Sequence, residues 1–198
     1  MARMRPKLRK VPTGETLLRT CIKTKAHVLD FDAERGLTAL GCLDDAPEAR
    51  WEDCNMDKII FICTGNTCRS PMAEGLFRAH GGEEQTGLAA ASAGLFTQDG
   101  MPASQNAITA AKELGADITG HRSRMLTPDL AHEARYLVCM TGAHYDRLCE
   151  LFPDCTDKIF TLTGRDISDP FGGDLEIYRR AAAEIDAGVR SIIERLKK

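Results

Sequence analysis

A cysteine and an arginine lie six positions apart in the segment Cys63-Thr-Gly-Asn-Thr-Cys-Arg-Ser70. A thiolate is a strong nucleophile, and the planar guanidinium of Arg69 can hold two oxygens of a phosphoryl group. The loop between them can surround an anion with backbone N–H groups, and it consists of Thr64, Gly65, Asn66, Thr67 and Cys68. The spacing therefore predicts a site at which sulfur attacks phosphorus.

The neighbouring residues favour the same chemistry. The Ser70 hydroxyl is expected to donate a hydrogen bond to the sulfur and so to favour the thiolate. Pro71 suits the first turn of a helix, where its missing N–H costs nothing. Gly65 and Asn66 tolerate the left-handed backbone that a tight loop needs. The alternative, an inert cysteine in a packed turn, does not account for the whole segment at a strand-to-helix junction.

The loop can hold an anion only if a strand ends at Cys63 and a helix begins near Ser70. The apolar run 58–63 predicts a buried parallel strand, and residues 70–80 predict a helix that Gly81 and Gly82 end. Further strands are predicted at 88–95, 136–140 and 159–162, and further helices at 103–114, 143–152 and 174–196. This alternation predicts an α/β fold, a four-stranded parallel sheet with helices on both faces.

The reaction also needs a proton donor for the leaving group. Asp169 is the best candidate, because Asp169-Pro170 follows the fourth predicted strand and should reach the edge of the sheet that carries Cys63. Asp166 is a weaker candidate because no proline follows it. The alternative is that Asp169 only shapes the turn before the last helix.

These motifs together resemble the low-molecular-weight protein tyrosine phosphatase family. The Cys63–Ser70 loop, Asp169-Pro170 and Ser92-Ala93-Gly94 carry the resemblance, which spans residues 57–198. It implies a phosphatase I-like three-layer sandwich. It also implies a phosphocysteine on Cys63, with Asp169 acting first as acid and then as base. Cys68 would form a reversible disulfide with Cys63, or else be a small apolar loop residue.

Two positions indicate the substrate. Tyrosine-directed members carry a bulky aliphatic residue where this chain has Thr67, and an aromatic pair where it has Phe171-Gly172. Thr67 with Asp-Pro-Phe-Gly-Gly resembles the bacterial protein-arginine phosphatases. We therefore hypothesise phosphoarginine in proteins as substrate, with Phe171 among the binding residues. A tyrosine phosphatase is the first alternative, although Thr67 could also be only a packing residue.

The second alternative is an arsenate reductase, which would need further redox cysteines; Cys139, Cys149 and Cys155 are available. The apolar surroundings of Cys139 favour a packed thiol instead. His121, Arg122 and Ser123 resemble a family segment that either lines the substrate approach or forms a solvated loop. His132 and His144 are interpreted as surface or capping residues. No cofactor motif and no metal-site spacing occurs, so neither group is expected.

Composition limits the partners. The chain has 198 residues and a net charge of −3, which favours neither nucleic acid nor an acidic membrane. No apolar run approaches the ~20 residues of a membrane span. The eight cysteines include no CxxC pair and are read as mostly reduced, as in a cytoplasmic protein. The expected partners are phosphorylated proteins.

The chain divides near residue 56. Residues 57–198 are predicted to form the phosphatase domain, and residues 1–56 an N-terminal extension of unknown role. Residues 1–25 carry eight Lys or Arg and one acid, and residues 26–57 carry nine acids and two bases. This pattern favours a solvated extension over a nucleic-acid arm. Met56 also resembles a natural start leading into the first strand.

Overall fold

The computed structural model describes residues 57–197 and contains one sheet of four parallel strands. The strands lie in the order β2-β1-β3-β4. Their bounds are Lys58–Cys63 for β1, Ala89–Gly94 for β2, Ala134–Cys139 for β3 and Ile159–Thr161 for β4. The predicted α/β class and parallel four-stranded sheet are confirmed, and β1 has the predicted bounds.

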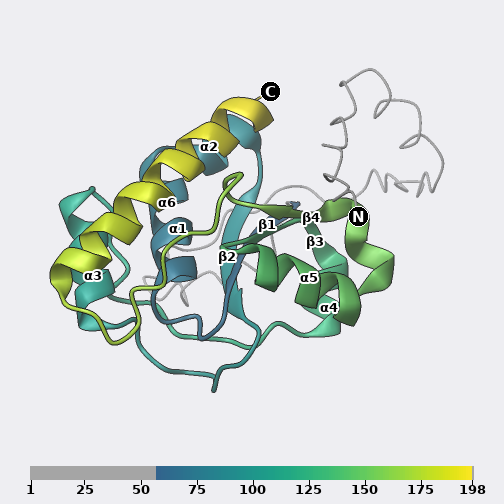
Figure 1. The fold of residues 1–198 in the computed structure, drawn as a ribbon. Coiled ribbons are helices and arrows are strands. Elements are labelled where there is room, and N and C mark those ends of the chain that lie inside the picture. The colour runs from purple at the N-terminus through teal and green to yellow at the C-terminus, as the bar shows by residue number, and fades with distance from the viewer. Residues whose placement is uncertain (1–56, 198) are drawn as a thin grey trace, which may run out of the picture. The chain divides into compact units, whose positions relative to one another are not determined.

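Six α-helices and one 3-10 helix accompany the sheet in the described part of the chain (Figure 1). They are α1 (Arg69–Ala79), α2 (Gly82–Thr86), α3 (Gln105–Glu113), α4 (Pro128–Glu133), α5 (Gly142–Leu151), η3 (Pro153–Lys158) and α6 (Leu175–Leu196). Gly81, with φ of 67°, follows the end of α1 as predicted, but Gly82 then opens the short helix α2.

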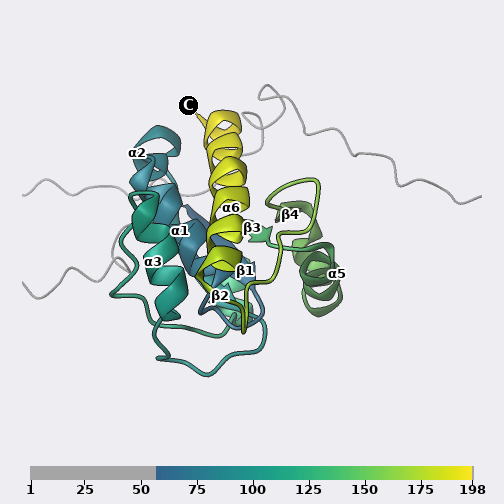
Figure 2. The same cartoon turned by 60° about the vertical axis from the view of Figure 1, so that its left-hand side comes forward.

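The central strand β1 supplies side chains to two hydrophobic cores, one on each face of the sheet. Ile59 and Phe61 pack with α1, α3 and α6, whereas Ile60 and Ile62 pack with α4 and α5. This alternation follows from the two-residue period of a strand. Figures 1 and 2 show the two helical layers on opposite sides of the sheet. The predicted three-layer sandwich is therefore confirmed.

The last helix, α6, covers one face of the sheet with an apolar stripe. Asp174 caps its first turn by accepting a hydrogen bond from the N–H of Ile177 at 3.0 Å. Its buried residues are Tyr178, Ala181, Ala182, Ile185, Gly188, Val189 and Ile193. These positions follow the 3.6-residue period of a helix, and the predicted helix over 174–196 is confirmed.

The predicted extension, residues 1–56, and its basic segment at residues 1–25 lie outside the described residues. The domain boundary stays a prediction. Between residues 57 and 197, no helix has both the length and the apolar character needed to cross a membrane.

Candidate active site

The loop from Cys63 to Arg69 joins the carboxyl end of β1 to the first turn of α1. It opens into a pocket of about 280 Å³ lined by Cys63, Thr64, Gly65, Thr67, Cys68, Arg69, Phe96, Asp169 and Phe171. No side chain of the described residues caps the start of α1, so its positive end can act on an anion in the loop. The pocket contains most of the predicted site residues, and Asn66 and Ser70 lie buried behind it.

The sulfur of Cys63 lies at the bottom of this loop. The residue is only 3% exposed, and its Sγ lies 2.9 Å from Ser70 Oγ. The backbone N–H of Asn66 donates to the same sulfur at 3.3 Å. Because Ser70 Oγ already accepts from Asn66 Nδ2 at 2.9 Å, its own proton is free to point at the sulfur, as predicted.

Asn66 organises a buried hydrogen-bond network beneath the loop. Its Nδ2 donates to Ser70 Oγ and to Ser92 Oγ, each at 2.9 Å, and its Oδ1 accepts from the N–H of Arg124. Ser92 in turn donates to the Glu74 carboxylate at 2.5 Å. We call Asn66, Ser70, Ser92 and Glu74 the floor of the site. Every donor of the Asn66 amide is used, so its orientation is fixed.

The loop backbone confirms one of the two predicted left-handed positions. Asn66 has φ of 50°, but Gly65 does not have a positive φ. Next to this loop, a glycine is required at Gly94, at the end of β2. A Cβ there would lie 2.8 Å from the carbonyl oxygen of Thr64, closer than van der Waals contact allows.

His121 supports the loop from behind. Its Nε2 lies 2.7 Å from the carbonyl oxygen of Asn66, and burial lowers its pKa. Ser123 is buried, and its hydroxyl bonds the N–H of Met101 and the carbonyl oxygen of Gln98. The expectation of a solvated loop is therefore wrong for Ser123, and a place along the substrate approach stays a prediction for residues 121–123. The sequence does not reveal this support because it links residues 55 positions apart.

Arg69 and Asp169 meet across the pocket. A guanidinium nitrogen of Arg69 donates to Asp169 Oδ2 at 2.8 Å, and a second bonds the carbonyl oxygen of Ile167 at 3.3 Å. Arg69 is buried, whereas the Asp169 side chain is 55% exposed and open to a proton-accepting or proton-donating partner. Asp166, the weaker candidate, instead accepts from the N–H of Gly142 at the start of α5.

Two aromatic side chains stand at the mouth of the pocket. Phe171 is 81% exposed, and Phe96, just after β2, is 63% exposed. Large apolar side chains left in water beside a pocket are typical of a binding surface. The sequence predicted Phe171 as a binding residue because it belongs to the Asp-Pro-Phe-Gly-Gly motif. Phe96 was not predicted, because a single apolar residue outside any motif carries little signal. We call Thr67, Phe96, Asp169 and Phe171 the rim of the site.

Cys68 contacts a buried tyrosine of α6. Its Sγ lies 3.2 Å from the Tyr178 hydroxyl on α6 and 3.6 Å from Ser104 Oγ. Burial raises the pKa of Tyr178, so the phenol stays neutral and able to donate. All five cysteines of the described residues, Cys68 included, are free. Burial raises the pKa of both Cys139 and Cys155, which disfavours the reactive thiolate in each.

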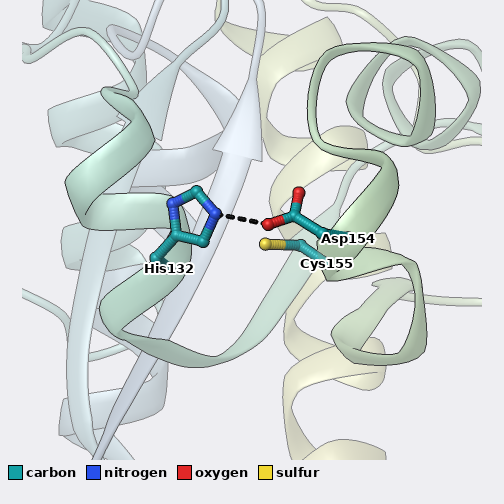
Figure 3. A group of neighbouring side chains, drawn as sticks. All are labelled: His132, Asp154 and Cys155. Atoms are coloured by element: carbon teal, nitrogen blue, oxygen red, sulfur yellow. Dashed lines mark hydrogen bonds and ion pairs between the residues drawn. The ribbon is translucent and has the colours of Figure 1, made fainter.

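His132, Asp154 and Cys155 form a separate cluster between α4 and η3 (Figure 3). His132 bonds Asp154 through Nε2 and the carbonyl oxygen of Pro128 through Nδ1, each at 2.6 Å. The carboxylate raises the pKa of His132, as expected of an imidazolium that donates from both nitrogens. With both nitrogens engaged, the geometry fits an ion pair. The prediction that His132 lies at the surface is confirmed.

The fold and this loop define a class of phosphatases. Residues 58–198 match the family described as low molecular weight phosphotyrosine protein phosphatase. The chain belongs to this family.

Relatives of known description have three different activities. A protein-arginine phosphatase of Geobacillus stearothermophilus is 40% identical over 146 residues, which cover 71% of this chain and 96% of the relative. The solved structure of the YwlE arginine phosphatase of that organism superposes with a TM-score of 0.66. The match covers 71% of this chain and 92% of the YwlE chain. A probable low-molecular-weight tyrosine phosphatase, EpsP of Ralstonia solanacearum, is 32% identical over 70% of this chain and 95% of the relative. An arsenate reductase of Bacillus cereus is 31% identical over 71% of this chain and 96% of the relative.

Proposed function

We propose that this phosphatase hydrolyses phosphoarginine in proteins. The observation that carries the proposal is the arrangement of Cys63, Arg69 and Asp169 around one pocket that has a threonine, Thr67, in its wall. The 40% identity to a protein-arginine phosphatase over nearly its whole length supports the same substrate. Phosphorylated proteins are thus the substrates, and phosphoarginine is the proposed phosphorylated group.

In the first step, the Cys63 thiolate attacks the phosphorus while the phosphorus–nitrogen bond breaks. Asp169, protonated for this step, gives its proton to the departing guanidine nitrogen. The charge on the phosphoryl oxygens is stabilised by Arg69 and by loop N–H groups. The proton of Ser70 stabilises the sulfur before attack and again when it leaves.

In the second step, water attacks the phosphocysteine. Asp169, now a carboxylate, takes a proton from the water, and the sulfur–phosphorus bond breaks to release inorganic phosphate and the thiolate. The Arg69–Asp169 contact of 2.8 Å describes the resting site. An arriving phosphoryl group would take the Arg69 donors and release Asp169 to act on the leaving group.

The rim supports a guanidinium as leaving group. A planar cation can stack on the exposed rings of Phe96 and Phe171 and donate to Asp169. The Thr67 hydroxyl keeps the adjoining wall polar, where a bulky aliphatic residue would favour a neutral ring. The same two rings could also stack on the ring of phosphotyrosine, so a tyrosine phosphatase remains the second candidate.

An arsenate reductase receives less support from the structure. The reductase chemistry needs reactive partner thiols, and burial raises the pKa of Cys139 and Cys155. Turnover of arsenate with thioredoxin as reductant would restore this candidate.

Cys68 is proposed to protect Cys63 by forming a reversible disulfide after oxidation of the nucleophile. Peroxide followed by thiol should then restore activity in the wild-type protein and less of it in Cys68→Ser. Equal recovery would argue against protection. A cytoplasmic location belongs to the same proposal, and the five free cysteines among the described residues support a reducing compartment.

The substrate proposal is tested with full-length protein and a protein substrate that carries both phosphoarginine and phosphotyrosine. Mass spectrometry of the substrate should show loss of phosphate from arginine first. Acid-free quenching of the enzyme should find phosphate on Cys63, because phosphocysteine lies on the reaction path. Removal of phosphate from tyrosine alone would contradict the substrate and leave the cysteine mechanism intact.

A further inference from the structure

His144 is a buried histidine that touches the catalytic loop from a distant part of the chain. It lies in the first turn of α5 and is only 8% exposed. Its Nε2 lies 2.9 Å from Oγ1 of Thr64, the residue immediately after Cys63. The sequence-based expectation of a surface position is therefore wrong, and capping explains only part of its contacts.

The other side of the ring is held by Thr141. The Thr141 hydroxyl oxygen accepts from the backbone N–H of His144 at 3.2 Å, which caps α5. The same oxygen lies 2.8 Å from His144 Nδ1. Helix capping needs only the backbone contact, so the imidazole is not required for it. Both ring nitrogens are bonded, and one of them is bonded to the active-site loop.

The charge state of the ring follows from its surroundings. Burial and the positive charge of Arg69 lower the pKa of His144, while Asp169 and Asp166 act in the opposite direction. The ring is therefore neutral near pH 7, with one nitrogen as donor and one as acceptor. Because Thr141 Oγ1 already accepts a bond, its proton is available for Nδ1. When the Thr141 hydroxyl donates to Nδ1, the ring proton lies on Nε2.

A proton on Nε2 determines the direction of the Thr64 hydroxyl. The Nε2–H donates to Thr64 Oγ1, so the hydroxyl proton of Thr64 must point away from His144. Thr64 lines the pocket that contains Cys63, where a hydroxyl proton has an anion as its natural acceptor.

We propose that His144 is a positioning residue of the active site, which through its Nε2–H turns the Thr64 hydroxyl into a donor for a phosphoryl oxygen. The inference rests on the proposed function, because the acceptor is the phosphoryl group. It extends the catalytic machinery to α5 and predicts that His144 acts only through Thr64. Its contribution should appear with any phosphoryl substrate, since the contact is to the group common to all of them.

The test is a double-mutant cycle in the full-length protein with p-nitrophenyl phosphate as substrate. Thr64→Val removes the hydroxyl and keeps the shape, and His144→Leu removes both ring contacts. Each should lower kcat about tenfold, the effect of one lost hydrogen bond to a charged group. The double variant should lose no more than either single variant. His144→Gln, whose amide can donate in place of Nε2–H, should recover much of the rate.

Two further measurements make the test decisive. His132→Leu is the matched control, a histidine at the surface whose loss should leave kcat unchanged. Nitrogen-15 NMR should show the Nε2–H tautomer of His144 near pH 7. An unchanged kcat in His144→Leu, additive losses in the double variant or an Nδ1–H tautomer would each overturn the inference. An inactive wild-type protein would overturn the proposed function as well, so the two failures are distinguishable.

Discussion

The floor and the rim of the active site differ in burial and in hydrogen bonding. The floor residues Asn66, Ser70, Ser92 and Glu74 are all buried, and their side chains bond one another. The rim residues Phe96, Asp169 and Phe171 are largely exposed, although Asp169 bonds the buried side chain of Arg69. From this difference we infer that the buried floor residues hold the geometry for sulfur attack. The exposed rim side chains, which can be substituted without disturbing the core, determine substrate preference.

The largest effect should come from the sulfur that lies above the floor. Cys63→Ser should reduce turnover by ~10⁴-fold or more, because the nucleophile is lost while the anion site remains. Release of inorganic phosphate from a phosphorylated protein measures this. Cys149→Ser is the matched control, since Cys149 is a free, partly buried thiol of α5 that does not line the pocket, and its turnover should match wild type. A Cys63→Ser variant that retains a tenth of the wild-type activity would contradict nucleophilic attack by Cys63.

A floor substitution should damage both folding and catalysis. Asn66→Ala leaves Ser70, Ser92 and the N–H of Arg124 without their amide partner. Because unsatisfied buried polar groups are costly, we expect a loss of about 3 kcal/mol in the free energy of unfolding, with a lower kcat. Urea unfolding and steady-state kinetics measure the two effects.

Thr67→Ala is the matched rim variant for that experiment. It should unfold at the wild-type urea concentration, since Thr67 is only partly buried. Equal urea midpoints for Asn66→Ala and Thr67→Ala would remove the distinction between floor and rim.

A rim substitution should change binding more than chemistry. Phe171→Ala removes an exposed ring that contributes no core packing, so we expect KM to rise about fivefold with kcat nearly unchanged. Phe96→Ala should act in the same direction. A fall in kcat without a change in KM would mean that the rings position Asp169 rather than bind substrate.

The smallest expected effects are on stability at different pH. Burial lowers the pKa of His121 behind the floor, so its folded pKa lies below the unfolded value of about 6.5. Its burial therefore weakens the fold as the pH falls below that value. Asp154 raises the pKa of His132, so that pair contributes stability below about pH 6.5 and loses it as the pH rises through the raised pKa.

Urea unfolding at about pH 5.5 and about pH 7.5 separates these two histidines. Relative to wild type, His132→Gln should be weaker at the lower pH, and His121→Gln should lose less stability on acidification. The same pH dependence in both variants would contradict the assignment.

The chemistry of the loop was predictable because it is local. Cys63, Arg69 and Ser70 lie within eight residues, and the strand and helix around them have clear periodicity. The links to Ser92 and Arg124 were not predictable, because these residues lie 26 and 58 positions from Asn66 and only the fold brings them together. His144 was missed for the same reason.

The short elements were also missed. Helices α2 and α4 have five and six residues, too few for a helical period to be read. Helix α4 does carry a local signal, since Thr127 caps it and Pro128 occupies its first turn. Strand β3 begins at Ala134, two residues before the predicted start, because pairing with β1 extends it past the apolar run.

Thr67 is where the account of the rim is tested most directly. The measurement is the ratio of kcat/KM for phosphoarginine to kcat/KM for phosphotyrosine, in full-length wild type and in Thr67→Ile. We predict a ratio well above one in the wild type and a fall of about tenfold in the variant, because the isoleucine replaces a polar wall with an apolar one. Equal values for the two substrates, or a ratio that Thr67→Ile leaves unchanged, would contradict the account.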